Sequence, residues 1–296
     1  MKILIHCLAI ALASLLSAAL VQGQNLFESD GQSGNIYEFA PNGGSSTFAS
    51  GLSKPGGLAF DSAGNLFEAD YLSGHIYEFT PNGGSSTVAS GLSYPFGLAF
   101  SSAGNLFEAD PGSGHIYEFA PNGGSSTFAS GLSYPFSLAF NSAGNLFVAE
   151  YNGYNGTILE FTPNGGSSTF ASGLNEPLGL AFNSAGDLFV ADGGSGHIYE
   201  FTPNGGSSTF ASGLSGALGL AFNSAGDLFE ADDNSGHIYE FTPNGGSTTF
   251  ASALNEPAFL AFQGITLPIP EPSTLALVGL GVIALLGVRR RKNDSR

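Results

Sequence analysis

The sequence contains no tryptophan, a single cysteine and few basic residues among its 296 positions. Cys7, the only cysteine, lies in an N-terminal segment that we expect to be removed, which leaves the mature protein without disulfides or cysteine-based metal sites. Between residues 24 and 268, 22 acidic residues stand against one basic residue, Lys54, so this stretch has a net charge of −21. Such a body repels phosphate backbones, which excludes nucleic acid as a partner.

Long apolar runs are confined to the two ends of the chain. Residues 1–23 combine a lysine, an apolar run and a small, polar end, which is typical of a secretory signal peptide. We expect cleavage after Gly23, with Ala19 as the alternative site. The sequence therefore predicts an exported protein.

Glycine (44 residues) and phenylalanine (26 residues) are abundant, and they belong to an internal repeat. The triplet Leu-Ala-Phe recurs at intervals of 40, 40, 42, 40 and 40 residues. It ends at Phe60, Phe100, Phe140, Phe182, Phe222 and Phe262. The two additional residues lie in Tyr151–Thr157, where YNGYNGT replaces a five-residue turn. A period of this length indicates a repeat architecture.

Each period contains four short runs that are rich in Phe, Tyr, Ile and Thr and separated by Gly, Asn, Pro and Ser. In one copy the runs are GLAF (57–60), NLFEAD (65–70), HIYEFT (75–80) and SSTVAS (85–90). Runs this short form strands rather than helices. The pattern predicts four antiparallel strands per repeat, which is the blade of a β-propeller.

The two ends of the repeat region predict how the blades close. The first copy begins at Asn25 with its second strand, and a surplus first strand, 258–262, follows the sixth copy. Pairing of this strand into the first blade closes a ring, whereas an open solenoid needs polar capping repeats, and none is visible. We predict an all-β fold, a six-bladed β-propeller of four-stranded antiparallel blades over residues 24–263, closed by a C-terminal strand.

The pattern P-x-G-L-A-F-x-x-x-G-N-L-F-x-A-D-x-x-S-G-H-I, repeated over residues 25–262, resembles the NHL repeat blade and the related gluconolactonase/regucalcin and virginiamycin B lyase propellers. The absence of tryptophan separates it from WD repeats. The resemblance implies the architecture and leaves the activity open, because these propellers include binders, hydrolases and lyases.

In the gluconolactonase-like enzymes, the segment that enters an inner strand supplies an acidic metal ligand. The matching positions of this chain are Gly56, Phe96, Phe136, Leu178, Leu218 and Ala258. None of these side chains can bind a divalent cation. The comparison therefore weakens the hypothesis of a metal-dependent hydrolase.

A ring of acids ends the predicted second strands: Asp30, Asp70, Asp110, Glu150, Asp192 and Asp232. One interpretation is a cation site, with Ca²⁺ as the candidate ion and Asp70, Asp110, Asp192 and Asp232 as candidate ligands. The other is that each acid accepts hydrogen bonds from the backbone of the turn that follows it. Identical placement in every blade favours the turn interpretation, and we predict no other cofactor.

Two further sets of titratable residues recur with the repeat. His75, His115, His197 and His237 lie one blade apart, which disfavours a shared metal site. Glu28, Glu68, Glu108 and Glu230 occupy a strand position that is Val148 and Val190 in the other blades. Exchange with valine indicates a half-exposed strand surface, and burial with a raised pKa is the alternative.

Residues that depart from the repeat are the best candidates for a binding site. The loops that enter the inner strands and the loops between second and third strands share one face of a propeller, around the channel mouth. Here they carry Lys54, Tyr94, Phe96, Tyr134, Phe136, Tyr151 and Tyr154. An aromatic rim with polar neighbours suits sugar rings or a peptide. The alternative is loop drift between duplicated copies, and no catalytic residues are predicted.

The C-terminal region combines Pro270-Glu271-Pro272, an apolar span over 275–288 and a basic tail over 289–296. This order resembles the PEP-CTERM sorting signal. The resemblance implies export by a Gram-negative bacterium and processing by an exosortase, often in species that make extracellular polysaccharide.

We expect a linker over 264–274, a short hydrophobic helix that inserts in the membrane over 275–288, and a cytoplasmic basic tail. Fourteen residues rise about 21 Å as a helix, which is short of the roughly 30 Å hydrocarbon core. A plain single-span anchor is the alternative to a cleaved sorting signal.

The sequence thus predicts an exported, non-enzymatic scaffold of the cell envelope, surface or extracellular matrix, held in the inner membrane transiently or stably. Its predicted partners are the exosortase machinery and an extracellular polysaccharide, a surface protein or a cation. The alternative is a lactonase-type hydrolase or a lyase that uses a metal in the channel.

Overall fold

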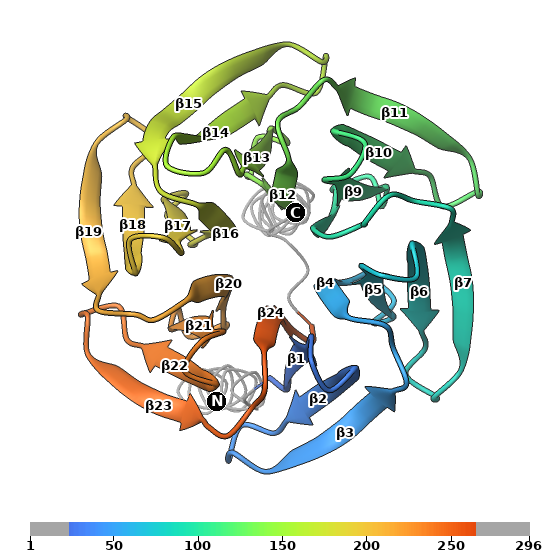
Figure 1. The fold of residues 1–296 in the computed structure, drawn as a ribbon, viewed down its shortest axis with the longest axis horizontal. Coiled ribbons are helices and arrows are strands. Elements are labelled where there is room, and N and C mark those ends of the chain that lie inside the picture. Colours follow the sequence, from blue (N-terminus) through green and yellow to red (C-terminus); the bar gives the residue numbers. More distant parts are fainter. Residues whose placement is uncertain (1–23, 265–296) are drawn as a thin grey trace, which may run out of the picture.

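A computed structural model describes residues 24–264, which form six four-stranded antiparallel sheets around a central axis (Figure 1). This confirms the predicted six-bladed propeller. The predicted signal peptide, the sorting motif, the helix over 275–288 and the basic tail lie outside the described residues. Within 24–264, no helix has the length and hydrophobicity needed to cross a bilayer.

Every blade runs outward from the axis through an inner, a second, a third and an outer strand (Figure 1). The inner strands are β24 (Pro257–Phe262), β4 (Pro55–Phe60), β8 (Leu98–Phe100), β12 (Pro135–Phe140), β16 (Pro177–Phe182) and β20 (Ala217–Phe222). The second strands are β1 (Leu26–Asp30), β5 (Leu66–Asp70), β9 (Leu106–Asp110), β13 (Leu146–Glu150), β17 (Leu188–Asp192) and β21 (Leu228–Asp232). The third strands are β2 (Asn35–Phe39), β6 (His75–Phe79), β10 (His115–Phe119), β14 (Gly156–Phe161), β18 (His197–Phe201) and β22 (His237–Phe241). The outer strands are β3 (Ser45–Ser50), β7 (Ser85–Ser90), β11 (Ser125–Ser130), β15 (Ser167–Leu174), β19 (Ser207–Ser212) and β23 (Ser247–Ala251).

The first blade is built from both ends of the described chain. Strand β24 pairs antiparallel with β1, with Phe262 opposite Leu26 and Leu260 opposite Glu28. The sheet order is β24-β1-β2-β3, so the C-terminal strand supplies the missing inner strand and closes the ring. The predicted closure is therefore confirmed.

The hydrophobic core lies between neighbouring blades, because the second strands are buried on both faces. In each interface the phenylalanine of a second strand meets the last phenylalanine of the next inner strand edge to face. Phe67 and Phe100 are one such pair, with ring centroids 5.0 Å apart at 78°. Phe229 and Phe262 form the pair that joins the sixth blade to the first, at 5.0 Å and 77°.

Glycines in three inner strands, and one directly before β8, allow the inner strands to approach one another at the axis. They are Gly57, Gly97, Gly179 and Gly219. A Cβ atom on Gly97 would lie 2.5 Å from the carbonyl oxygen of Phe136 in the next inner strand, closer than real Cβ contacts. Gly57 also donates its N–H to the carbonyl of Phe96 at 3.0 Å. The absence of a side chain is thus what brings the inner strands together.

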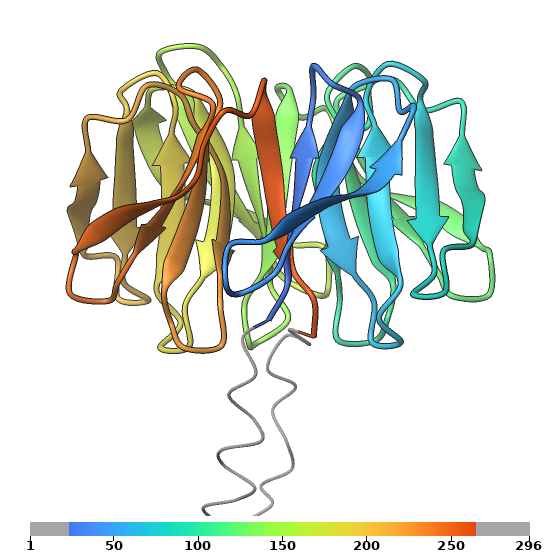
Figure 2. The ribbon, with the colours of Figure 1, turned by 90° about the horizontal axis from the view of Figure 1, so that it is seen from below.

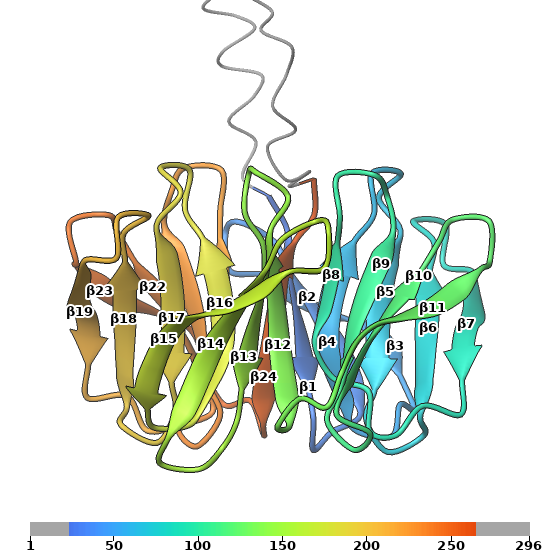
Figure 3. The ribbon, with the colours of Figure 1, turned by 90° about the horizontal axis from the view of Figure 1, so that it is seen from above.

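Both ends of the described chain lie on one face of the ring, opposite the loops that enter the inner strands (Figures 2 and 3). Gln24 Nε2 donates to the carbonyl of Gln263 at 3.1 Å, and Gln263 N donates to the carbonyl of Asn25 at 3.0 Å. The chain therefore enters and leaves the propeller side by side.

Removal of β24 tests the closure. A chain that ends at Glu256 loses Leu260 and Phe262, and the loss of each buried side chain costs about 2–5 kcal/mol. The total approaches the roughly 5–15 kcal/mol by which a typical domain is stable, and β1 is left with an open edge. We expect no cooperative thermal transition by circular dichroism. A chain that ends at Gly264 is the matched control and should melt cooperatively; identical melting of the two chains would contradict the role of β24.

Candidate functional site

The loops that enter the inner strands and the loops between second and third strands form one face of the ring. Backbone hydrogen bonds tie the two kinds of loop together: Tyr71 N donates to Lys54 O at 3.1 Å, and Gly31 N to Glu256 O at 2.9 Å. At their centre lies a cavity of about 230 Å³, here called the mouth cavity. Its wall includes Lys54, Tyr71, Phe96, Tyr134, Phe136, Asp233 and Glu256.

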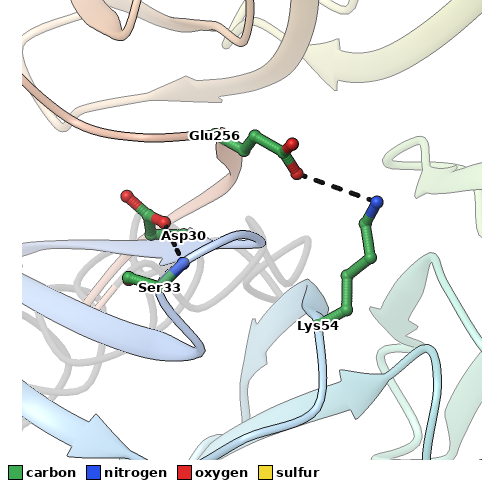
Figure 4. Close-up of polar contacts among 4 residues, drawn as sticks. All are labelled: Asp30, Ser33, Lys54 and Glu256. Carbon is green, nitrogen blue, oxygen red and sulfur yellow. Dashed lines mark hydrogen bonds and ion pairs between the residues drawn. The ribbon is translucent and has the colours of Figure 1, made fainter.

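The acids that end the second strands hold these loops in place. Asp70 accepts the N–H of Ser53 at 2.6 Å and the N–H of Ser73 at 3.1 Å, one with each carboxylate oxygen. Asp30 makes the corresponding bonds, of which the one to Ser33 is drawn in Figure 4. Related contacts are made by Asp110, Glu150, Asp192 and Asp232. These are the hydrogen bonds expected if each acid accepts from the backbone of the turn that follows it.

Those bonds engage carboxylate oxygens that a cation would otherwise use. Among residues 24–264, no three or more His, Cys, Asp or Glu side chains are grouped so as to hold a metal ion. A calcium role for Asp70, Asp110, Asp192 and Asp232 stays a prediction. Three of the recurring histidines stack on tyrosines of their own strands, as His75 does on Tyr77 with ring centroids 5.6 Å apart, and His115 is tilted against Tyr117.

Four equivalent positions at the mouth hold a strained backbone with large side chains. Lys54, Tyr94, Tyr134 and Glu176 have φ values of 86°, 66°, 55° and 63°. Non-glycine residues seldom adopt this region, and the strain costs on the order of 1–3 kcal/mol for each. Glycine would relieve the strain at these places. That these large side chains occupy strained positions indicates that the side chains themselves have a role.

Four tyrosines from the second, third and fourth blades form a row along the rim, here called the aromatic arc: Tyr94, Tyr71, Tyr134 and Tyr151. Tyr71 stacks on Tyr94 at 4.9 Å, its hydroxyl lies 3.4 Å from that of Tyr134, and Tyr134 packs on Tyr151 at 5.7 Å. Burial and the bond to Tyr134 raise the pKa of Tyr71 to about 12. Tyr94 and Tyr134 remain 48% and 39% exposed.

The insertion of the fourth blade contributes Tyr151 to this row and places Tyr154, 87% exposed, beside it. The loop covers residues 151–155, and Gly156 and Thr157 already belong to β14. The structure thus brings together three of the predicted tyrosines, Tyr94, Tyr134 and Tyr151. Tyr154 extends from the same loop without joining the row.

Phe96 and Phe136 lie deeper than an exposed rim. Their rings are 4.1 Å apart, and Phe259 packs against both, at 5.2 Å from Phe96 and 6.3 Å from Phe136. Phe96 is only 8% exposed. Phe96 and Phe136 therefore form an apolar wall of the mouth cavity, supported by Phe259, rather than part of its exposed edge.

The other half of the rim is acidic and comes from the fifth, sixth and first blades. We call Glu176, Asp233 and Glu256 the acidic arc. Lys54 Nζ lies 3.7 Å from Glu256 Oε2 (Figure 4), and the two side chains are 45% and 37% exposed, so the pair contributes about 0–1 kcal/mol. Tyr151 donates its hydroxyl to Glu176 Oε1 at 3.2 Å. Burial, followed by the charge of Glu256, raises the pKa of Asp233.

The recurring glutamates are the clearest departure from expectation. Glu28, Glu68, Glu108 and Glu230 are 0% exposed, so the half-exposed strand surface inferred from exchange with valine is wrong. No hydrogen bond of ordinary length and angle reaches their carboxylate oxygens, and a backbone N–H near each, such as that of Gly56 at Glu68, lowers the pKa less than burial raises it. Burial, reinforced by the aspartate two residues further on, raises all four pKa values well above 4.5. The second strands lie between blades, so both of their faces are core.

Glu108 and Val148 occupy the same position in neighbouring blades and provide a reciprocal test. The pKa of the Glu108 carboxyl is higher in the folded protein than its value of 4.5 in the unfolded chain. Its contribution to the stability of the folded protein is therefore fully present below pH 4.5 and is lost as the pH rises through the folded-state pKa. Glu108→Val should raise the free energy of unfolding near about pH 8 by on the order of 1–3 kcal/mol.

Val148→Glu should lower the free energy of unfolding and make its fall with pH steeper. Urea titrations at an acidic and an alkaline pH measure both effects. An unchanged pH dependence in Glu108→Val would show that this carboxyl is ionised in the folded protein.

The sequence analysis missed five residues of the mouth: Tyr71, Phe259, Glu176, Asp233 and Glu256. Each departs from the repeat, which is the property that selected Tyr94 and Tyr134. Tyr71 and Asp233, for example, follow the acid that ends a second strand, where two other blades have glycine. Comparison of all six blades at this position would have found them.

Residues 268–292 match the family described as the PEP-CTERM protein-sorting motif. A search among curated proteins gives no match. The propeller resembles a chain of a nidogen/laminin complex, with a TM-score of 0.75 and 18% identity over 81% of this chain and 98% of that chain. It also resembles a putative gluconolactonase, with a TM-score of 0.64 and 15% identity over 73% of this chain and 87% of that chain. A virginiamycin B lyase from Staphylococcus aureus gives a TM-score of 0.62 and 15% identity over 82% of this chain and 92% of that chain. At these identities the likeness concerns the fold.

Proposed function

We propose that this protein is an exported, non-enzymatic binding protein that holds a glycan at the mouth of its propeller. The observation that carries the proposal is the mouth cavity of about 230 Å³, with a wall of phenylalanines and the aromatic arc on its rim. Exposed tyrosine rings combine an apolar face with a hydroxyl, which matches the apolar faces and hydroxyls of sugars. Backbone strain beneath Tyr94 and Tyr134 also favours a functional site.

The sorting motif indicates export and recognition by exosortase machinery. It begins at residue 268, four residues beyond Gly264, and the described chain ends on the face opposite the mouth (Figure 2). A tether or a sorting complex on the tail therefore approaches the far face. The mouth then points away from the membrane, toward the polysaccharide of a Gram-negative cell surface or matrix, which we propose as the partner.

A lactonase-type hydrolase or a lyase is the second candidate, because similar folds include a putative gluconolactonase and a virginiamycin B lyase. The inner-strand entry positions favour binding over this chemistry. They carry Gly56, Phe96, Phe136, Leu178, Leu218 and Ala258 where the resemblance calls for a carboxylate ligand.

Removal of two exposed rings tests the binding role. Each aromatic contact contributes about 0.5–1.5 kcal/mol, so the double variant Tyr94→Ala with Tyr134→Ala should weaken retention on the host's polysaccharide roughly tenfold. Affinity electrophoresis in gels containing that polysaccharide measures the effect. Leu72→Ala, which removes a 61% exposed side chain next to Tyr71, is the control and should bind like the parent.

Two outcomes would argue against this function. Retention of the tyrosine variant at the parent level would show that the arc is loop drift. One tightly bound divalent ion after purification with calcium, together with turnover of simple lactones, would favour the second candidate instead. Circular dichroism of each variant establishes that the ring is intact.

Processing is tested by intact-mass measurement of the surface-exposed protein. We expect loss of residues 1–23 and cleavage near Pro270-Glu271-Pro272, because the motif over 268–292 is a sorting motif. A surface form that retains residues 273–296 in a host that has an exosortase would identify a permanent anchor.

A further inference from the structure

We infer that the glycan bound at the mouth carries free amino groups, that is, that the site takes an amino-sugar polymer. This inference rests on the proposed function and names its ligand class. It follows from the division of the rim into two halves. The aromatic arc comes from the second to fourth blades, and the acidic arc of Glu176, Asp233 and Glu256 from the fifth, sixth and first.

The charges of the mouth are not balanced. Lys54 is the only lysine or arginine in residues 24–264, and it pairs with Glu256. Its charge also lowers the pKa of Asp233, though less than burial raises it, so within residues 24–264 this one cation faces the three carboxylates of the acidic arc. The ammonium group of a ligand can supply the missing counter-charge, whereas an anionic polymer meets a body of net charge −21.

The two arcs are linked at two places, once directly and once through Lys54, so one sugar chain can contact both at once. Tyr151 bonds Glu176 at 3.2 Å at one junction. At the other, Tyr71 N bonds the carbonyl of Lys54, whose side chain reaches Glu256. A pyranose ring stacked on the tyrosines thus lies next to carboxylates. An amino group there gains both ion pairing and attraction to the tyrosine ring faces.

The rim favours a sugar over a peptide because its backbone groups are already used. Asp70 accepts the N–H of Ser53, Lys54 accepts that of Tyr71, Glu256 accepts that of Gly31 and Asp30 accepts that of Asn255. Peptide capture by main-chain hydrogen bonds would need such groups free. What the mouth offers is ring faces, hydroxyls and carboxylates.

Two oligomers that differ only in the charge of their amino groups test the inference. Calorimetry of the mature protein with glucosamine hexamer and N-acetylglucosamine hexamer, at mildly acidic pH, should give at least tenfold tighter binding of the charged hexamer. The double variant Glu176→Gln with Asp233→Asn should reduce this preference to less than threefold. The control removes two equivalent carboxylates outside the mouth, Glu78→Gln with Glu200→Gln, whose only hydrogen bonds are hydroxyl contacts of 3.3 and 3.4 Å.

Each alternative result has a separate meaning. Equal binding of both hexamers overturns the inference and leaves the proposed glycan-binding function standing. Equal loss of preference in the control variant, or binding of hexalysine as tight as that of glucosamine hexamer, overturns it in favour of general charge attraction. Absence of binding to both hexamers, with the host's polysaccharide still retained through the tyrosines, overturns the amino-sugar assignment alone. Loss of that retention as well removes the proposed function.

Discussion

The edge-to-face contact between two phenylalanines sets the geometry of the whole ring. It occurs at all six interfaces, from Phe27–Phe60 to Phe229–Phe262, with centroids 5.0–5.1 Å apart and interplanar angles of 76–79°. A ring of six blades closes only if the six rotations between neighbouring blades add up to a full turn, and six nearly identical contacts meet this condition with equal steps. This requirement explains why every blade has nearly the same sequence. It also explains why the closing strand β24 must supply Phe262 for the last pair, Phe229–Phe262.

Because the interfaces between blades are nearly identical, the sequence differences between blades lie mainly at the mouth. The loops there are held by the same aspartate-to-backbone hydrogen bonds in most blades, so the frame is fixed while the residues on it differ. Lys54, Tyr94, Tyr134 and Glu176 stand at one repeat position and share a left-handed backbone, but their side chains differ in charge and shape. The scaffold is therefore symmetric but the rim of the mouth is not: one half of the rim is aromatic and the other half is acidic.

The sequence predicted the blades and their closure because both depend on local pattern: strand length, turn residues and the count of strands at each end. It also selected Tyr94, Tyr134 and Tyr151, because a residue that departs from the repeat can be recognised from the sequence alone. It could not predict that Lys54 would reach Glu256, or that Tyr71 would lie against residues of two other blades, because these contacts link residues far apart in the chain. The burial of Glu68 and its equivalents was missed for another reason. Exchange with valine is compatible with a half-exposed strand, but valine fits a strand that is buried on both faces equally well.

The position of β24 gives the ring a definite mechanical direction. This strand runs from the mouth face to the opposite face, where the described chain ends, roughly along the ring axis (Figure 2). If a ligand holds the mouth while the tail is held at the cell, tension passes along β24 and slides it past β1. The hydrogen bonds between antiparallel strands are perpendicular to the strands, so such a pull shears them all together instead of opening them one by one. The seam of the ring would then be loaded in its most resistant direction.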